Sequence, residues 1–379
     1  MKITFITSGH LPKDDRIYYH QARTLTDTGN SAEIISSKQE FSGSENSVGF
    51  NCFEDISLSK KDKIAKFIKL LQNSKPDIII CSEPLTILAA SRYKKQTDKK
   101  PKIIYDITEW YPSKKFLTGY NSGLKAPRFF KLLIFNLMMA AKADAFIFGE
   151  WYKGKPYRFL FPGKKFLYSG YYPDLKYIRY REPGIEKELL RLSYSGKLSI
   201  EKGFGNFLET IELLTLKRPG LKIRIKIIGW YDSEKEQKIF EKMIASFPEN
   251  VSFKFYPMQD YLTFIELIND TDIFLDLRSD DFENQRCLPI KLFYYAALKR
   301  PVIFTNLKAI RKEVDISKFG HLVKPDNIET ISGLILNYID NQTIYNRHCT
   351  SARKLAESKY NWGAIKDEFT EFLQKLIEE

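Results

Sequence analysis

The sequence is poor in the residues that mark several classes of protein. Its four cysteines, Cys52, Cys81, Cys287 and Cys349, stand far apart in 379 residues and lack the spacing of a metal site. We therefore expect reduced thiols in a cytoplasmic protein rather than a disulfide-stabilised secreted domain. The four histidines are scattered, and no Asp-x-Asp stands convincingly at a strand end. The sequence consequently predicts no metal site.

Long apolar runs are also missing. The best stretch, residues 129–148, is interrupted by Lys131, Lys142 and Asp144, whereas a membrane-spanning helix needs ~18–20 apolar residues. It is better read as a helix leading into a strand. The first six residues are typical of a strand and lack the apolar core and cleavage site of a secretion signal.

Two nucleotide-binding motifs are absent as well. No Gly-x-Gly-x-x-Gly follows the first predicted strand, which argues against a nicotinamide or flavin dehydrogenase. No Gly-x-x-x-x-Gly-Lys-Ser/Thr occurs, which excludes a P-loop. Apolar residues make up 43% and charged residues 28% of a chain long enough for two domains.

Acidic residues are fewer than basic ones, which gives the chain a formal net charge of +13. Such an excess favours nucleic acid, an anionic membrane surface or a phosphorylated substrate as partner. Residues 151–181 hold many of the basic side chains, interleaved with aromatic ones. We expect this segment to contact an anionic membrane, on the inner face of which the protein would be peripheral. A solvated basic surface is an equal alternative, and single-stranded nucleic acid is a weaker one that we do not predict.

Predicted strands and helices alternate along the chain, which is typical of a parallel sheet covered by helices. The pattern predicts an α/β protein with two Rossmann-like domains facing a central cleft. A stretch rich in Tyr, Pro and Gly after residue 168 indicates the boundary. We expect domains at 1–170 and 189–355, a linker at 171–188, and a C-terminal helix at 356–379. The predicted strands are 2–7, 32–36, 77–81, 102–106, 145–148, 190–195, 222–229, 251–255, 273–277 and 302–304.

Two basic segments follow predicted strands in the second half. Residues 192–204 are expected to form a strand, a glycine turn carrying Lys197 and Lys202, and a helix. Residues 288–303 place Lys291 behind a proline at the start of an apolar helix. Helix N-terminal amides and ammonium groups both stabilise a phosphate. Because the carboxyl ends of parallel strands share one edge of a sheet, the two segments predict a diphosphate site.

These segments resemble motifs of the retaining family 4 of glycosyltransferases, which have the GT-B fold. Residues 196–203 are similar to a Gly-Arg/Lys…Lys-Gly turn, and residues 289–303 to Pro-x-Lys-Leu-Phe-Glu-Tyr-x-Ala…Pro-Val-Ile. Residues 10–29 resemble the family's His…Asp-x-Arg-Ile-Phe…Ala…Leu…Gly opening, and residues 104–112 its Tyr-Asp-x-His-Glu-x-x-Pro stretch. The four matches stand in the right order and span most of the chain.

The resemblance implies transfer of a sugar from a nucleoside-diphosphate donor, with retention of configuration and without a metal or other cofactor. Residues 1–170 would bind the acceptor and residues 189–355 the donor, while the last helix would cross back to the first domain. Lys197 and Lys202 are the expected catalytic groups that stabilise the leaving diphosphate. The expected donor-binding residues are Gly196, Gly203, Gly229, Pro289, Lys291 and Tyr294.

One departure from the family lies in the donor site. Tyr294 stands where the family has a glutamate that accepts hydrogen bonds from the ribose, and a phenol lacks a carboxylate's charge and bidentate reach. Eight residues earlier, where the family often has another glutamate, stands Arg286. We expect either that Glu283, three residues before it, reaches the donor sugar as a catalytic group, or that it is a solvated loop residue.

By the same resemblance the first half binds the acceptor. The expected acceptor-binding residues are His10, Asp14, Arg16 and Glu83. An arginine at a helix start opposes the helix dipole, so Arg16 should have a ligand or carboxylate partner, or pair locally with Asp14. Glu109 is the expected catalytic group that orients a sugar hydroxyl, and Thr108 replaces the family's histidine. Alternatively, one of the carboxylates caps the helix that follows it.

The sequence thus predicts a glycosyltransferase that acts on a polysaccharide or lipid-linked glycan. Thr108 and Tyr294 replace ionisable residues of the family. They support an alternative from another class, a non-catalytic GT-B-like binding subunit of a polysaccharide assembly system.

Overall fold

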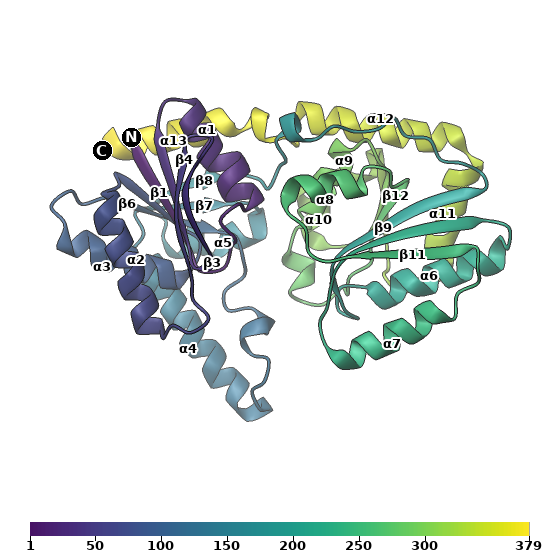
Figure 1. The fold of residues 1–379 in the computed structure, drawn as a ribbon, viewed down its shortest axis with the longest axis horizontal. Helices are drawn as coiled ribbons and strands as arrows, with labels where there is room; N and C mark the ends of the chain where they lie inside the picture. The colour runs from purple at the N-terminus through teal and green to yellow at the C-terminus, as the bar shows by residue number, and fades with distance from the viewer. Residues whose placement is uncertain (379) are drawn as a thin grey trace. The chain divides into compact units, whose positions relative to one another are not determined.

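The structure is a computed structural model that describes residues 1–378 and divides into two compact units (Figure 1). Unit 1 comprises Met1–Tyr171 and the segment that begins at Ile365, and unit 2 comprises Tyr172–Ala364. Each unit is a largely parallel sheet covered by helices. The predicted α/β fold with two Rossmann-like domains is confirmed. Unit 2 begins inside the segment expected to be a linker.

Unit 1 is built around an eight-stranded sheet. Its strands are β1 (Lys2–Thr7), β2 (Ser31–Ser36), β3 (Lys38–Glu45), β4 (Val48–Glu54), β5 (Ile78–Cys81), β6 (Lys102–Ile107), β7 (Ala145–Phe148) and β8 (Lys165–Tyr168). The spatial order is β3-β4-β2-β1-β5-β6-β7-β8, and β3 is the antiparallel strand at the edge. Its helical segments are η1 (Asp15–Ala22), α1 (Arg23–Asp27), α2 (Lys60–Ser74), α3 (Pro84–Gln96), η2 (Lys114–Phe116), α4 (Ser122–Ala140), α5 (Trp151–Leu160) and α13 (Lys366–Glu378).

Unit 2 has a six-stranded, fully parallel sheet. Its strands are β9 (Leu189–Leu198), β10 (Lys222–Tyr231), β11 (Val251–Tyr256), β12 (Ile273–Asp276), β13 (Val302–Thr305) and β14 (Gly320–Val323), in the order β11-β10-β9-β12-β13-β14. Its helical segments are η3 (Leu175–Tyr177), α6 (Phe204–Lys217), α7 (Glu234–Ala245), α8 (Tyr261–Ile268), η4 (Asn284–Arg286), α9 (Lys291–Ala297), α10 (Lys308–Glu313), η5 (Ile316–Lys318), α11 (Ile328–Asp340), α12 (Gln342–Ser358) and η6 (Trp362–Ala364).

Continuous apolar runs form the central strands because helices cover both faces of a parallel sheet. The run 78–81 in unit 1 and the run 302–304 in unit 2 are both buried throughout. Each unit has its own hydrophobic core. The last helix, α13, starts at Lys366 rather than at the predicted residue 356, packs on α1 and buries Phe369 and Leu373.

The segment predicted to contact a membrane, residues 151–181, uses several of its cations inside the protein. Lys164 Nζ donates to the Ala141 carbonyl at 2.6 Å, at the C-terminal end of α4. Lys153 Nζ donates to the Thr108 carbonyl, also at 2.6 Å, and Lys176 pairs with Asp174. These cations therefore have partners within unit 1 or unit 2. Among the described residues, no helix is both long enough and apolar enough to span a bilayer.

Candidate functional site

Two glycines shape residues 196–203, the end of β9 and the turn to α6, which we call the glycine turn. The predicted strand ended at residue 195, but β9 continues to Leu198, so Gly196 and Lys197 lie within the strand. Gly196 has φ +115° and Gly203 has φ +78°, the left-handed region that favours glycine. A Cβ on Gly203 would lie 2.1 Å from the Leu277 carbonyl oxygen, so only glycine allows this approach. The hydroxyl of Tyr194, inside β9, donates to the carbonyls of Lys197 at 3.0 Å and Lys202 at 2.9 Å. The turn is thus held at both ends.

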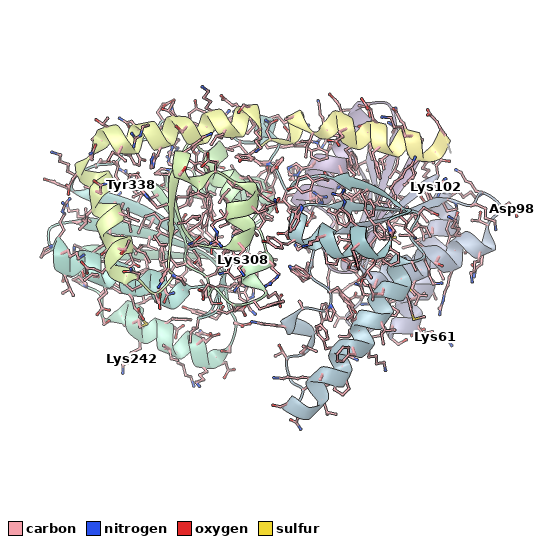
Figure 2. The ribbon with its side chains drawn as sticks, turned by 180° about the vertical axis from the view of Figure 1, so that it is seen from behind. Lys61, Asp98, Lys102, Lys242, Lys308 and Tyr338 are labelled. Atoms are coloured by element: carbon pink, nitrogen blue, oxygen red, sulfur yellow. The ribbon has the colours of Figure 1, made fainter. Side chains whose placement is uncertain are left out.

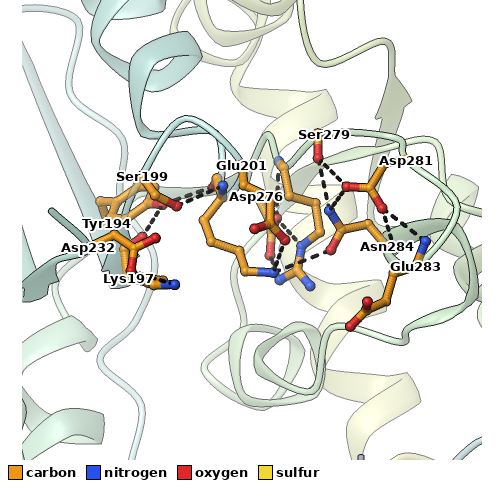
Figure 3. A network of polar contacts seen from close by, with 12 residues as sticks. Tyr194, Lys197, Ser199, Glu201, Asp232, Asp276, Ser279, Asp281, Glu283 and Asn284 are labelled. Atoms are coloured by element: carbon orange, nitrogen blue, oxygen red, sulfur yellow. Dashed lines mark hydrogen bonds and ion pairs between the residues drawn. The ribbon is translucent and has the colours of Figure 1, made fainter. Parts of the chain in front are cut away.

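The two predicted catalytic lysines have different surroundings (Figure 3). Lys197 Nζ lies 2.6 Å from Asp232 Oδ1 at the end of β10, and both side chains are about one-third exposed. Lys202 Nζ lies 3.1 Å from Glu201 Oε1 and donates to Asn284 Oδ1 at 3.4 Å. The Lys202 ammonium therefore contacts the loop that follows β12, whereas the Lys197 ammonium, on β9, pairs with the carboxylate that follows β10.

The loop after β12 is an ordered network of polar contacts (Figure 3). Asp281 accepts the backbone N–H groups of Glu283 and Asn284 at 2.9 and 3.1 Å, and it also accepts the hydroxyl of Ser279 at 2.9 Å. The amide of Asn284 donates to Ser279 Oγ and Asp281 Oδ2. This network fixes Asn284, the partner of Lys202. The Glu283 carboxylate extends on the side of the loop away from Asp281.

A partly buried ion pair lies at the start of this loop. Arg278 Nε donates to Asp276 Oδ1 at 2.7 Å, and its Nη2 bonds the other oxygen. Burial opposes the charged form of Asp276, but Arg278 and Lys291 outweigh it and hold its pKa below the usual value. The Arg278 guanidinium therefore compensates the charge of this carboxylate, and Lys202 and Lys291 contribute additional positive charge nearby.

Lys291 joins the first turn of α9 to the glycine turn. Its Nζ donates to the Ser195 carbonyl, and a Cβ on Gly196 would lie 3.0 Å from that nitrogen. One helical turn later, the Tyr295 hydroxyl lies 3.0 Å from Ser195 Oγ, and the Tyr295 ring stacks on Phe274. The predicted convergence of Lys202, Lys291 and the glycine turn is therefore present within unit 2.

We predict that the affinity for a nucleoside-diphosphate donor depends on pH through Lys291. Burial lowers the pKa of its ammonium to about 8, with Asp276 opposing this and Arg278 and Lys202 adding to it. A bound diphosphate stabilises the protonated form. Binding should therefore be strongest below about pH 8 and weaken as the pH rises through that value. Calorimetry should find affinity for a nucleoside diphosphate about tenfold lower at about pH 9 than at about pH 7. Equal affinities at both, or the same dependence in Lys291→Met, would contradict this role.

Three other predicted donor residues are placed by packing. A Cβ on Gly229 would lie 1.8 Å from the Gly196 carbonyl oxygen, so β9 and β10 require glycine there. Pro289 is buried, and its carbonyl accepts the Leu292 N–H at 3.1 Å in the turn that opens α9. Tyr294 is 3% exposed, with its ring 5.7 Å from that of Tyr261 in α8.

In unit 1, the predicted acceptor loop centres on His10. Its Nδ1 lies 2.8 Å from Asp14 Oδ2 and its Nε2 3.4 Å from Thr108 Oγ1. Burial lowers the pKa of His10, but Asp14 first, then Glu83 and Glu109, outweigh it and raise the pKa to about 10. The imidazole is therefore a cation at neutral pH, and the structure brings His10, Asp14 and Thr108 together.

Arg16 has a distant partner rather than the local one. Its Nε and Nη2 donate to the two oxygens of Asp106 at 2.9 and 3.0 Å, and Nη1 donates to the Ser169 carbonyl at 2.9 Å. The guanidinium also lies 4.7 Å from the ring centroid of Tyr171. The carboxylate alternative therefore holds, and the Arg16–Asp14 side-chain pair was wrong. With 5% exposure, Arg16 supports the loop from within.

Glu83 is both a helix cap and an anchor of the predicted acceptor loop. It forms a capping box with Thr86 at the start of α3. Its Oε1 accepts the Thr7 hydroxyl at 2.7 Å and its Oε2 the Ser8 N–H at 2.8 Å. Glu109 is exposed beside Thr108. In residues 1–378, no group of three or more metal-ligating side chains gathers where it could hold a metal ion.

Sequence reasoning missed several residues of both sites. Asp276 and Arg278 form a pair two positions apart at a strand end, a spacing that could have signalled an ion pair. The roles of Asn284 and Tyr295 depend on contacts 82 and 100 residues away. No local pattern announces such contacts.

The chain is similar to known glycosyltransferases in part of its sequence and in its fold. Residues 180–362 match the family described as "Glycosyl transferases group 1". No curated protein matches the chain by sequence. The fold is similar to that of sucrose-phosphate synthase from Thermosynechococcus elongatus, with a TM-score of 0.74 and 13% identity, covering 100% of this chain and 99% of the other.

Two further solved structures have a similar fold. HepE of Anabaena, solved with UDP and glucose, has a TM-score of 0.72 at 13% identity and covers 99% of this chain and 100% of its own. A glycosyltransferase from Rickettsia africae has a TM-score of 0.69 at 14% identity, with coverages of 100% and 99%. Residues 180–362 thus match the glycosyl transferases group 1 family, in a chain that has the GT-B fold.

Proposed function

We propose that this protein transfers a sugar from a nucleoside-diphosphate sugar to a polysaccharide or lipid-linked glycan, with retention of configuration. The observation that carries the proposal is the gathering of Lys202 and Lys291 at the Gly196–Gly203 turn in unit 2. The HepE structures with UDP and UDP-glucose add support, since HepE shares this fold.

The leaving diphosphate would develop charge at the glycine turn. Lys202 and Lys291 would stabilise it as fixed cations, together with backbone amides at the start of α6, and Lys197 would add charge from β9. This arrangement would need neither a metal ion nor another cofactor. Glu283, at the η4 loop, would contact the donor sugar. In unit 1, the His10 cation and Glu109 would bind the acceptor, while Asp14, Arg16 and Glu83 hold that loop in place.

We further place the protein in the cytoplasm. All four cysteines are free thiols, and three of them are buried. Free thiols are typical of a reducing compartment.

A thermal-shift panel of nucleoside diphosphates tests the donor site. Binding stabilises the folded state by mass action, so a saturating ligand should raise the melting temperature by about 5 °C or more. Lys202→Ala should lose most of that shift. Lys242→Ala, at the exposed surface of α7 (Figure 2), should keep it. A shift that persists in Lys202→Ala, or none with any nucleotide, would count against the proposed donor site.

A second candidate is a non-catalytic binding subunit of a polysaccharide assembly system. The burial of Tyr294 against Tyr261 favours it, because the family's ribose-binding carboxylate has been replaced by a side chain that packs inward. Sugar release from a radiolabelled donor separates the candidates. Binding without any release or transfer would favour the subunit, and release would favour the transferase.

A further inference from the structure

Helix α4 carries a row of large apolar side chains on its outer side. Leu124, Phe130, Ile134 and Met138 are each 57–59% exposed, and we call them the apolar stripe. In both views the first half of α4 extends beyond the other helices of unit 1 (Figure 1, Figure 2). The stripe is therefore a concentrated patch rather than a scatter of single exposed residues.

Helix geometry separates the stripe from the packed side of α4. Residues four apart lie on one face, which aligns Phe130, Ile134 and Met138. Residues two apart lie about 200° from each other. Ile134 and Met138 therefore point away from Asn136 and Ala140, which are buried. Packing in unit 1 uses one side of α4, and the apolar stripe occupies the opposite side.

The charge around the stripe selects the kind of partner. Between Trp110 and Ala143 the sequence has six lysines and arginines and no aspartate or glutamate. On α4 itself, the exposed Lys131 lies on the same side as Met138, two turns away, whereas the exposed Lys125 lies on the opposite side. An apolar face bordered by cations alone complements a surface that is apolar inside and anionic outside, as at the interface of a bilayer with acidic lipids.

We propose that α4 docks on an anionic bilayer surface, with the apolar stripe inserted among the acyl chains and headgroups and with Lys131 at the lipid phosphates. The helix would lie in the interface, since no described helix is apolar enough to span. This surface takes the place of residues 151–181, where Lys153 and Lys164 bond backbone carbonyls. The proposal goes beyond sugar transfer and does not depend on the donor site.

Vesicle flotation tests the proposal on the full chain. The wild type should float with vesicles of phosphatidylglycerol and phosphatidylcholine, and much less with phosphatidylcholine alone. The triple variant Phe130→Gln, Ile134→Gln, Met138→Gln should bind the anionic vesicles about tenfold more weakly or worse, since three inserted apolar side chains are lost. Lys131→Gln should reduce binding and its dependence on salt.

A matched control removes three exposed apolar residues elsewhere. Ile56→Gln, Leu216→Gln and Met258→Gln change side chains that are 60–86% exposed, and this variant should float like the wild type. All variants should keep the wild-type melting temperature. The proposal would be overturned if the wild-type protein did not float with anionic vesicles. It would also be overturned by a stripe variant that binds normally, or by one that merely converts a dimer to a monomer in light scattering, which would identify α4 as a contact between two copies.

Discussion

Lys291→Met is expected to lower kcat/KM for sugar transfer by about 10²–10³-fold. Methionine keeps the length and apolar stem of lysine but removes the ammonium that bonds the Ser195 carbonyl beside Gly196. The charge would be missing where the leaving diphosphate forms. The loss should fall on both kcat and kcat/KM, because an interaction with the leaving group strengthens in the transition state. Steady-state transfer from a radiolabelled donor measures both constants.

Lys242→Met is the control for this substitution. Lys242 lies on the exposed surface of α7, and the change should leave both constants within about twofold of the wild type. Unfolding by urea checks that Lys291→Met still folds. A folded Lys291→Met variant with near wild-type kcat would remove Lys291 from the proposed mechanism, whatever its effect on donor affinity.

Arg16→Met is expected to destabilise unit 1 by about 3–5 kcal/mol. The substitution leaves Asp106, which is 1% exposed, without the guanidinium that contacts both of its oxygens. A buried carboxylate without its cation carries most of its desolvation cost. Urea unfolding followed by circular dichroism measures the change. Arg92→Met, on the exposed surface of α3, should change stability by less than about 0.5 kcal/mol.

A double-mutant cycle separates the pair from general damage. If the isolated carboxylate causes the loss, Arg16→Met combined with Asp106→Asn should be more stable than Arg16→Met alone, because no uncompensated charge remains. If the double variant loses the sum of the two single losses, the two side chains are energetically independent. The assigned partnership would then be wrong.

The central strands could be predicted because the information for them is local. Residues 2–7 form β1 with the predicted bounds, and the helix-to-strand interpretation of 129–148 is confirmed by α4 and β7. The hairpin of β3 and β4 was missed. None of the residues of β3 is buried, so no alternation marks it, and its stability comes from antiparallel pairing with β4. Edge strands of this kind depend on a neighbour rather than on their own sequence.

The site was predictable to the same extent. Glycine turns and lysines at strand ends are local signals, and they identified Lys202, Lys291 and the two positive-φ glycines. The partners of these residues were not predictable, because Arg16 meets Asp106 across 90 positions and Lys202 meets Asn284 across 82. The burial of Tyr294 depends likewise on α8, which precedes it in sequence but packs on it only in the folded unit.

The position of α13 in unit 1 affects the order in which the chain can fold during synthesis. Unit 2 is one continuous segment, whereas unit 1 needs residues from both of its segments. The ribosome must therefore complete all of unit 2 before α13 emerges and can bury Phe369 and Leu373. Until then the apolar surface of unit 1 that α13 covers is exposed to solvent. Unit 1, most of which is synthesised first, therefore completes its fold after unit 2 has been synthesised. Slow translation through unit 2 would prolong this exposure and favour aggregation of the nascent chain.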